Sequence, residues 1–164
     1  MDFRWHYDSP LGGITLRSDG YALTGLCFDG QQYSGDTSGP GPDVRQLRVF
    51  DETCRWLDLY FQGKDPGFTP VLRLHGTPFR MAVWEILRKI PYGRTMTYGE
   101  IATSLAVRQG RRTMSAQAVG GAVGHNPISL IIPCHRVIGA GGVLTGYAAG
   151  LDRKARLLQI EGVL

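Results

Sequence analysis

The 164-residue sequence has no long apolar run, few cysteines and no extreme net charge. No stretch approaches the roughly 18 apolar residues of a membrane-spanning helix. The N-terminal MDFRWHYDSP has neither the basic nor the apolar segment of a secretory signal, so we expect a cytoplasmic protein that does not bind membranes. Cys27, Cys54 and Cys134 are too widely spaced for a disulfide framework or a zinc site. We therefore expect a globular protein with reduced thiols and no metal or other cofactor.

Charge is distributed unevenly along the chain. Residues 1–76 carry seven basic and ten acidic side chains, whereas residues 77–164 carry eleven basic and four acidic ones, a net of +7. A basic half is typical of a protein that binds a polyanion, although an ordinary solvated surface gives the same count. We predict two domains with a boundary between residues 76 and 77.

The first half predicts strands followed by a helix. Strand-like runs at Ile14–Arg17 and Ala22–Phe28 flank the turn signal Asp19-Gly20, as in a β-hairpin. Asp29–Asp43 is rich in Gly, Pro, Ser and Asp, which predicts a flexible surface loop. Apolar residues then recur at steps of three and four from Val44 to Phe61, which predicts one amphipathic helix.

The second half predicts mainly helices. Thr77-Pro78 is a good helix start, and Thr97-x-x-Glu100 is a capping box that opens a second helix. Further predicted segments are a helix near Met114–Gly124, an extended run at Ile128–Ile132, a glycine-rich loop at Gly139–Gly150 and a final amphipathic helix containing Ala155, Leu158 and Ile160. The whole pattern predicts a mixed α+β protein.

The helix expected near Met114–Gly124 is made of small residues and contains two adjacent glycines, Gly120 and Gly121. Each glycine weakens a helix by roughly 1 kcal/mol relative to alanine. Either this helix packs very tightly against its own core, or it allows another surface to come close. Together with the preceding basic turn and helix, it is similar to a helix-turn-helix, although many helical hairpins bind nothing.

Cys134 is the best candidate nucleophile. Cys27 and Cys54 fall on apolar faces of predicted elements and read as small buried hydrophobes. Cys134 instead follows a proline at the end of an apolar run and precedes His135 and Arg136. Because neighbours in an extended chain point to opposite sides, a water or a local turn would have to link the thiol to the imidazole. Four acids of this half could polarise the histidine: Glu85, Glu100, Asp152 and Glu161.

The segment NPISLIIPCHRVIG, with AVGGAVGHNP before it and GYAAGLDRKARLLQIEG after it, resembles the O6-alkylguanine-DNA alkyltransferases (methylated-DNA–protein-cysteine methyltransferases). The resemblance covers essentially all of residues 77–164. SPLGGITL and WLDLYFQG look like the N-terminal module of the same family. The resemblance implies a ribonuclease H-like N-terminal module and a C-terminal, winged helix-turn-helix-like domain that carries the active site.

The resemblance also implies the chemistry. Cys134 accepts the alkyl group of a damaged guanine in a single, irreversible transfer, His135 acts as a base through a water, and Glu161 is its carboxylate. Asn126 braces the hinge before the active-site strand, and Tyr98 hydrogen-bonds and protonates the leaving base. Arg136 is expected to be structural or to face a phosphate.

The implied partner is double-stranded DNA carrying O6-alkylguanine, bound through its minor groove without sequence preference by a monomeric protein. The base must be flipped out of the stack, at a cost of a few kcal/mol. The residues implied to contact DNA are Tyr98, Arg111, Arg112, Ser115, Ala116, Gln117, Ala118, Gly120 and Gly121. Those implied to line the substrate pocket are Pro133, Val137, Tyr147, Ala148, Ala149 and Lys154.

Two positions depart from the family pattern. Gln117 stands where many members have an arginine that fills the gap left by the flipped nucleotide. Ala148-Ala149 replaces smaller or hydroxyl residues, and Ala149 is expected to narrow the pocket against bulky adducts.

Two other functions remain open on these residues. One is a cysteine hydrolase that uses Cys134 and His135 and regenerates its thiol. The other is a module that binds alkylated DNA without repairing it, although relatives of that kind lack the nucleophilic cysteine.

Overall fold

The computed structural model describes residues 2–31 and 47–164. Most of the predicted loop Asp29–Asp43, and the first predicted helical residue, Val44, lie outside these residues. The chain divides into two compact units. The first comprises the described residues up to Leu74 together with Pro127–Ser129, and the second comprises His75–Asn126 and Leu130–Leu164.

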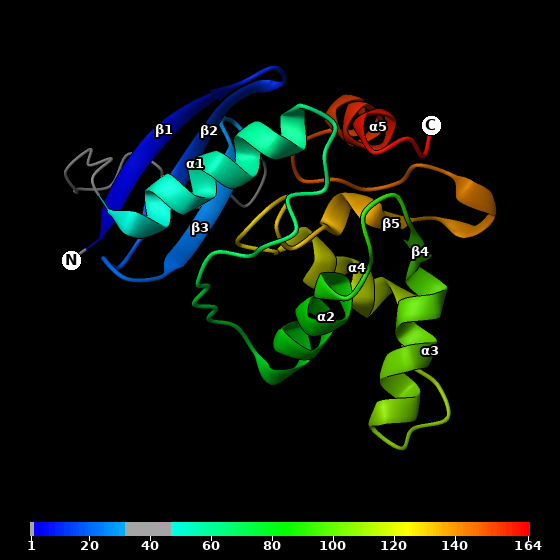
Figure 1. Ribbon diagram of the computed structural model, residues 1–164. Helices are drawn as coiled ribbons and strands as arrows, with labels where there is room; N and C mark the ends of the chain where they lie inside the picture. Colours follow the sequence, from blue (N-terminus) through cyan, green and yellow to red (C-terminus); the bar gives the residue numbers. More distant parts are fainter. Residues whose placement is uncertain (1, 32–46) are drawn as a thin grey trace. The chain divides into compact units, whose positions relative to one another are not determined.

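The first unit is built on a three-stranded antiparallel sheet in the order β1-β2-β3, with β1 at Phe3–Ser9, β2 at Gly12–Ser18 and β3 at Leu23–Phe28 (Figure 1). The predicted hairpin is β2–β3, and its turn is held by Asp19, whose Oδ1 accepts hydrogen bonds from the amides of Tyr21 and Ala22. Strand β1 was not predicted. Its signal was present in Phe3–Tyr7, where aromatic and polar residues alternate with the period of a half-buried strand.

Helix α1, Arg48–Phe61, lies across one face of this sheet (Figure 1). Its apolar stripe of Phe50, Cys54 and Leu57 is buried, and Tyr7 Oη of β1 donates a hydrogen bond to Asp58 Oδ1 at 2.5 Å. Cys27 and Cys54 are both buried, as predicted, and burial raises the pKa of Cys27 to about 11. Burial thus disfavours the reactive thiolate form of Cys27.

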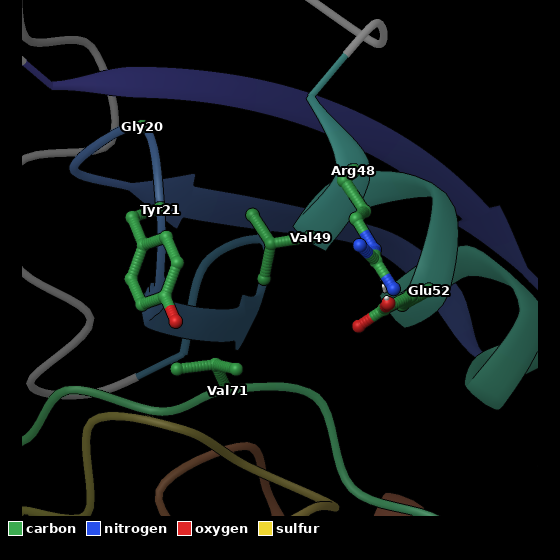
Figure 2. A pocket seen from close by; sticks show the side chains of 6 residues that line it. All are labelled: Gly20, Tyr21, Arg48, Val49, Glu52 and Val71. Atoms are coloured by element: carbon green, nitrogen blue, oxygen red, sulfur yellow. Dashed lines mark hydrogen bonds and ion pairs between the residues drawn. The ribbon is translucent and has the colours of Figure 1, made fainter.

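A surface pocket of this unit lies beside the hairpin turn and the start of α1 (Figure 2). Tyr21 and Val71 are exposed on it, and Arg48 Nε pairs with Glu52 Oε1 at 3.0 Å along the helix. The pocket's lining residues among those described are Gly20, Tyr21, Arg48, Val49, Glu52 and Val71.

The second unit is mainly helical, and its helix starts follow the predicted caps. The helices are α2, Pro78–Arg88; α3, Tyr98–Arg108; α4, Ala116–Gly124; and α5, Leu151–Ile160. Thr77 Oγ1 accepts from the Arg80 amide at 3.2 Å, and Thr97 Oγ1 accepts from the Glu100 amide at 3.0 Å. These caps satisfy amides that a helix start leaves without partners. Two short parallel strands, β4 at Met96–Thr97 and β5 at Val137–Ile138, join the start of α3 to the chain after Cys134.

The prediction of an extended run at Ile128–Ile132 was wrong. Ile128 makes one isolated bridge with Leu26, and the chain then turns. Leu130 adopts a φ of 70°, a left-handed conformation that no other non-glycine residue has in the described part of the chain. Bulky residues rarely adopt this conformation, so the apolar composition of the run gave no hint of the turn.

Taken together, the elements confirm the predicted α+β class. None of the helices in residues 2–31 and 47–164 combines the length and the apolar character required to cross a membrane.

Candidate active site

Cys134 opens a single turn of 3₁₀ helix, Cys134–Arg136, that leads directly into β5. The Arg136 amide donates to the Pro133 carbonyl at 3.0 Å, and the Cys134 amide donates to the Ile132 carbonyl at 2.8 Å. Proline suits this position because its φ is already near the −81° observed and it has no amide to satisfy. Cys134 and His135 therefore lie in a local turn and not in an extended chain.

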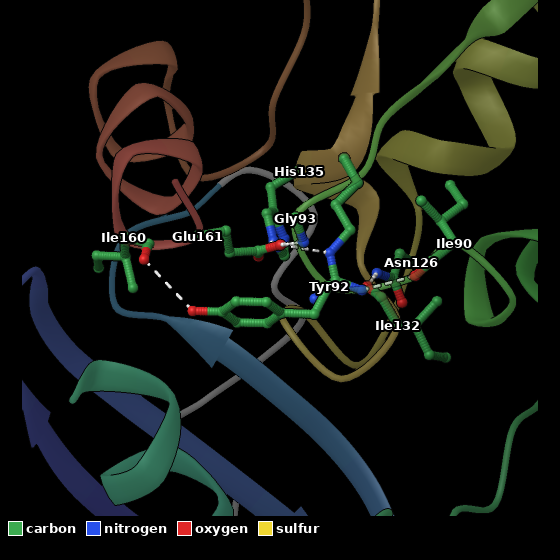
Figure 3. Close-up of polar contacts among 9 residues, drawn as sticks. Ile90, Tyr92, Gly93, Asn126, Ile132, His135, Ile160 and Glu161 are labelled. Carbon is green, nitrogen blue, oxygen red and sulfur yellow. Dashed lines mark hydrogen bonds and ion pairs between the residues drawn. The ribbon is translucent and has the colours of Figure 1, made fainter. Parts of the chain in front are cut away.

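His135 is completely buried and its Nε2 is hydrogen-bonded to Glu161 Oε2 (Figure 3). The partner that the sequence alone left open among four acids is thus Glu161, at the end of α5. Burial lowers the pKa of His135, although the nearby carboxylate acts in the opposite direction. The imidazole is therefore neutral in the resting protein and able to accept a proton.

The second oxygen of Glu161 is held as firmly as the first. Glu161 Oε1 accepts from Arg136 Nε at 2.8 Å and from the Gly93 amide at 2.9 Å. Burial alone would raise the pKa of Glu161, but the hydrogen bond to His135, together with the charge and hydrogen bond of Arg136, lowers it to about 2. The carboxylate therefore stays ionised and fixes the orientation of the histidine.

Arg136 itself is anchored on three sides. Beyond Glu161, its Nη1 donates to the Ile90 carbonyl at 2.7 Å, and its guanidinium carbon lies 5.7 Å from the centre of the Tyr92 ring. Only 8% of Arg136 is exposed. This burial argues against a contact with a phosphate and supports the structural role.

Asn126 lies just after α4 and supports the chain that leads to the cysteine. Its Nδ2 donates to the Ile132 carbonyl at 2.7 Å, which ties the end of α4 to the turn before Pro133 (Figure 3). The segment that it braces is a turn rather than the strand that was expected.

The loop before α5 is held by Tyr98 and Lys154. Tyr98 Oη donates to the Thr145 carbonyl at 3.0 Å, and Lys154 Nζ donates to the carbonyls of Thr145 and Gly146 at 2.9 and 3.1 Å. Lys154 is fully buried, and this burial lowers its pKa to about 8. The two side chains thereby position the segment that carries Tyr147 and the adjacent alanines.

Cys134 is buried, with 5% of the residue exposed, and burial raises the pKa of its thiol. Three side chains oppose this effect by favouring the thiolate: Asn126 and Tyr147 through hydrogen bonding, and Lys154 through its positive charge. The resting group is therefore a thiol that needs a base to ionise it, in surroundings that can stabilise the anion.

The residues predicted to line the pocket differ in their burial and in their relation to Cys134. Lys154 through its charge and Tyr147 through hydrogen bonding lower the pKa of the Cys134 thiol. Pro133 and Val137 are its close neighbours in the chain and are buried, Ala149 is also buried, and Ala148 is half-buried.

The residues predicted to contact DNA form an exposed surface on α4 and the turn before it. The exposed members are Arg111, Arg112, Ser115, Ala116, Gln117, Ala118 and Gly121. Ser115 is the N-cap of α4, with its Oγ accepting from the Ala118 amide at 3.2 Å. A methyl group on Gly120 would lie at ordinary contact distance from the Tyr98 ring, 3.8 Å away, whereas one on Gly121 would meet no atom within 4 Å. Tight internal packing therefore does not explain Gly121.

Sequence reasoning missed the contribution of Gly93 and Ile90 to the site. Both act through backbone groups, the Gly93 amide and the Ile90 carbonyl. Side-chain identity carries no signal for such contacts, although a proline and a glycine at positions 91 and 93 are typical of an irregular backbone. In the described residues, no group of three or more His, Cys, Asp or Glu side chains could hold a metal ion.

Comparison with known proteins matches both units. Residues 4–74 match the model of the 6-O-methylguanine DNA methyltransferase ribonuclease-like domain, and residues 78–163 match that of the DNA binding domain. The methylated-DNA–protein-cysteine methyltransferase of Mycobacterium tuberculosis is 44% identical over 159 residues, covering 95% of this chain and 92% of the relative. That of Haemophilus influenzae is 40% identical over 159 residues, covering 96% and 85%.

Solved structures of methyltransferases of this kind are also similar to the chain. The crystal structure of Mycobacterium tuberculosis OGT in complex with DNA superposes with a TM-score of 0.85 at 42% identity, covering 97% of this chain and 92% of that one. An O6-methylguanine DNA methyltransferase from Methanococcus jannaschii gives a TM-score of 0.63 at 28% identity, covering 97% and 93%.

Proposed function

The chain belongs to the 6-O-methylguanine DNA methyltransferase family, and from that premise we propose that it repairs DNA by moving an alkyl group from O6 of guanine onto Cys134. The observation that carries this assignment is the arrangement around the cysteine. A buried thiol begins a rigid turn, and the next residue is a neutral histidine fixed by an ionised carboxylate.

The reaction balances with the groups present. His135, held by Glu161, takes the thiol proton through a water, and Cys134 Sγ forms a bond to the alkyl carbon. The bond from that carbon to O6 breaks, and its electron pair passes to the guanine, which takes up a proton. The thioether cannot return the alkyl group, so each molecule reacts once. Because thiolate and leaving guanine account for all electrons, we expect no cofactor.

Tyr98 is proposed to hydrogen-bond and protonate the leaving base. In the structure its hydroxyl instead donates to the Thr145 carbonyl, with the Gly146 carbonyl 3.4 Å away. The role therefore requires Tyr98 Oη to exchange a carbonyl for the base. Burial raises the pKa of Tyr98, so its hydroxyl remains a proton donor at neutral pH.

DNA is proposed to lie against the exposed face of α4, with the minor groove over its small residues and phosphates near Arg111 and Arg112. The open space over Gly121 supports close approach of another surface. The net charge of +7 on residues 77–164 supports binding to phosphates without sequence preference. Flipping the alkylated nucleotide would then bring O6 to the buried sulfur.

We further propose that residues 77–164 carry both DNA binding and chemistry, that residues 1–76 form a structural domain, and that the protein acts as a monomer in the cytoplasm. The first two points are supported by the position of every predicted site residue after residue 76.

The proposal is tested by incubating the protein with an excess of duplex containing O6-methylguanine and measuring restored guanine and intact protein mass. Repair by transfer yields one restored guanine per protein, with a mass gain of one methylene. A binding module would hold the duplex with no mass gain. A hydrolase would restore many guanines per protein and leave its mass unchanged. Either of the last two results would overturn the proposal.

A further inference from the structure

The hydroxyl group of Tyr147 is a buried polar group that the mechanism above does not use. Its Oη has essentially no exposed surface and no hydrogen-bond partner within residues 2–31 and 47–164. Buried polar groups are almost always paired, and a hydroxyl left without a partner costs about 1–3 kcal/mol. The other pocket tyrosine, Tyr98, has its hydroxyl satisfied by backbone carbonyls. A hydrogen-bond acceptor that forms during the reaction would satisfy the Tyr147 hydroxyl.

An ionised Cys134 acts on Tyr147 through its charge. After burial, that charge is the largest influence on the pKa of Tyr147, and hydrogen bonding to Cys134 is a further cause of the shift. A neutral thiol is a weak acceptor, whereas a thiolate is a strong one. Burial raises the pKa of Tyr147 well above its usual value, so its hydroxyl stays protonated and can only donate to that anion.

We propose that Tyr147 Oη donates a hydrogen bond to the Cys134 thiolate and is a further catalytic residue of this protein. This inference rests on the proposed function, in which Cys134 is the nucleophile. Two sets of side chains then act on Cys134 in different ways. His135 and Glu161 remove the proton, and Tyr147 stabilises the charge left on sulfur.

The other polar groups near Cys134 have partners besides its sulfur. Asn126 favours the thiolate by hydrogen bonding, but its Nδ2 also donates to the Ile132 carbonyl, and Lys154 Nζ donates to the carbonyls of Thr145 and Gly146. Lys154 favours the thiolate through its positive charge. A charge on Cys134 raises the pKa of Tyr98, but the Tyr98 hydroxyl donates to the Thr145 carbonyl. Among these four side chains, Tyr147 is the donor with no other acceptor.

The test is the ionisation of the Cys134 thiol in protein without DNA. The rate of Cys134 alkylation by iodoacetamide is measured against pH, with modified peptides separated by mass. Tyr147→Phe should move the midpoint upward by about one pH unit and slow the reaction about tenfold below the midpoint. The matched control is Tyr21→Phe, which removes a hydroxyl from an exposed tyrosine of the first unit and should leave the midpoint unchanged.

A midpoint that is the same in Tyr147→Phe and the unaltered protein would overturn the inference. If repair of duplex then slowed without a change in the midpoint, the hydroxyl would be a contact to the substrate instead. A separate outcome concerns the proposed function. If Tyr147→Phe shifts the midpoint of Cys134 alkylation but the unaltered protein gains no methylene from damaged DNA, the hydrogen bond is supported and the repair proposal is overturned.

A second variant guards against loss of folding in Tyr147→Phe. Incorporating 3-fluorotyrosine at position 147 keeps the shape of the ring and makes the hydroxyl a stronger donor. The midpoint of the Cys134 thiol should then move downward, opposite to the change expected for phenylalanine. A downward shift supports the hydrogen bond, and an unchanged or raised midpoint contradicts it.

Discussion

Arg136 and Glu161 form a buried ion pair, with Arg136 Nε donating to Glu161 Oε1 at 2.8 Å while Glu161 Oε2 holds His135. The arginine of the Pro-Cys-His-Arg motif thus acts on the cysteine indirectly, through the carboxylate and then the imidazole. It does so by charge and by geometry, because the same guanidinium is tied to the Ile90 carbonyl. Arg136 is a positioning residue.

Removing this arginine should destabilise the protein. Arg136→Met leaves Glu161 buried without its main cation, and breaking a buried pair typically costs about 3–5 kcal/mol. Adding Glu161→Gln should recover part of the loss, because no charge is then left unpaired. Urea unfolding of the two single variants and the double variant measures the coupling. A double variant whose loss equals the sum of the single losses would contradict it.

Acid should destabilise the protein through Glu161. Its pKa is lowered to about 2 in the folded protein, so between about pH 4.5 and 2 the unfolded chain binds more protons than the folded one. Its contribution, on the order of 3 kcal/mol, is therefore present above pH 4.5 and lost as pH falls through that window. His135 adds to the loss below about pH 6.5, because burial lowers its pKa.

The measurement is urea unfolding at several pH values. Glu161→Gln should flatten the fall in stability between pH 4.5 and 2. Glu85→Gln removes an exposed carboxylate on α2. The stability of this control variant should still fall between pH 4.5 and 2. Equal pH dependence in the two variants would rule out this role for Glu161.

The caps and periodicities of the sequence predicted most of the helical framework, because those signals are local. Thr77 and Thr97 cap the helices that they were expected to cap. The active-site turn was not predictable in this way. It depends on the left-handed Leu130 and on backbone groups of Ile90 and Gly93, which the rest of the fold holds in place.

The same distinction applies to the site residues. Cys134 could be proposed as the nucleophile from its neighbours alone, because a proline and two polar residues interrupt an apolar run. Its carboxylate could be chosen only from the family resemblance, because Glu161 is 26 residues from His135 and no local pattern connects them. Even the resemblance did not assign Arg136 to that carboxylate.

Gly121→Ala should separate stability from DNA binding. The added methyl meets no atom within 4 Å, and alanine favours a helix over glycine by roughly 0.5–1 kcal/mol, so the free energy of unfolding should rise. Affinity for duplex DNA should fall, because the methyl occupies the proposed path of the minor groove. Gly124→Ala adds a methyl in equally open space at the end of α4 and is the matched control. If anisotropy titrations give Gly121→Ala and Gly124→Ala the same affinity for duplex DNA, the proposed contact is refuted.

Arg111 and Arg112 should contribute phosphate contacts. Changing both to glutamine should make the plot of log binding constant against log salt concentration shallower by about 2, from about 0.9 per phosphate contact. The expected weakening is the same for all sequences. Arg88→Gln removes an exposed arginine from α2 and should leave the slope unaltered. A slope unchanged by the double substitution would place the DNA elsewhere.

Gln117→Arg should strengthen binding of damaged duplex and speed its repair. The exposed glutamine at the start of α4 is shorter than arginine and uncharged, so it fills the gap of a flipped nucleotide less well. Single-turnover repair on duplex DNA at several protein concentrations measures both effects. The interpretation fails if binding and rate both match those of the unaltered protein.

The central claim is that Cys134 is the alkyl acceptor, and peptide mass mapping after exposure to duplex containing O6-methyl-deuterated guanine tests it most directly. The account predicts one deuterated methyl group per protein, found in the peptide that carries Cys134, and none in the protein with Cys134→Ser. Label on the peptides of Cys27 or Cys54, or label that persists in the Cys134→Ser protein, would contradict it.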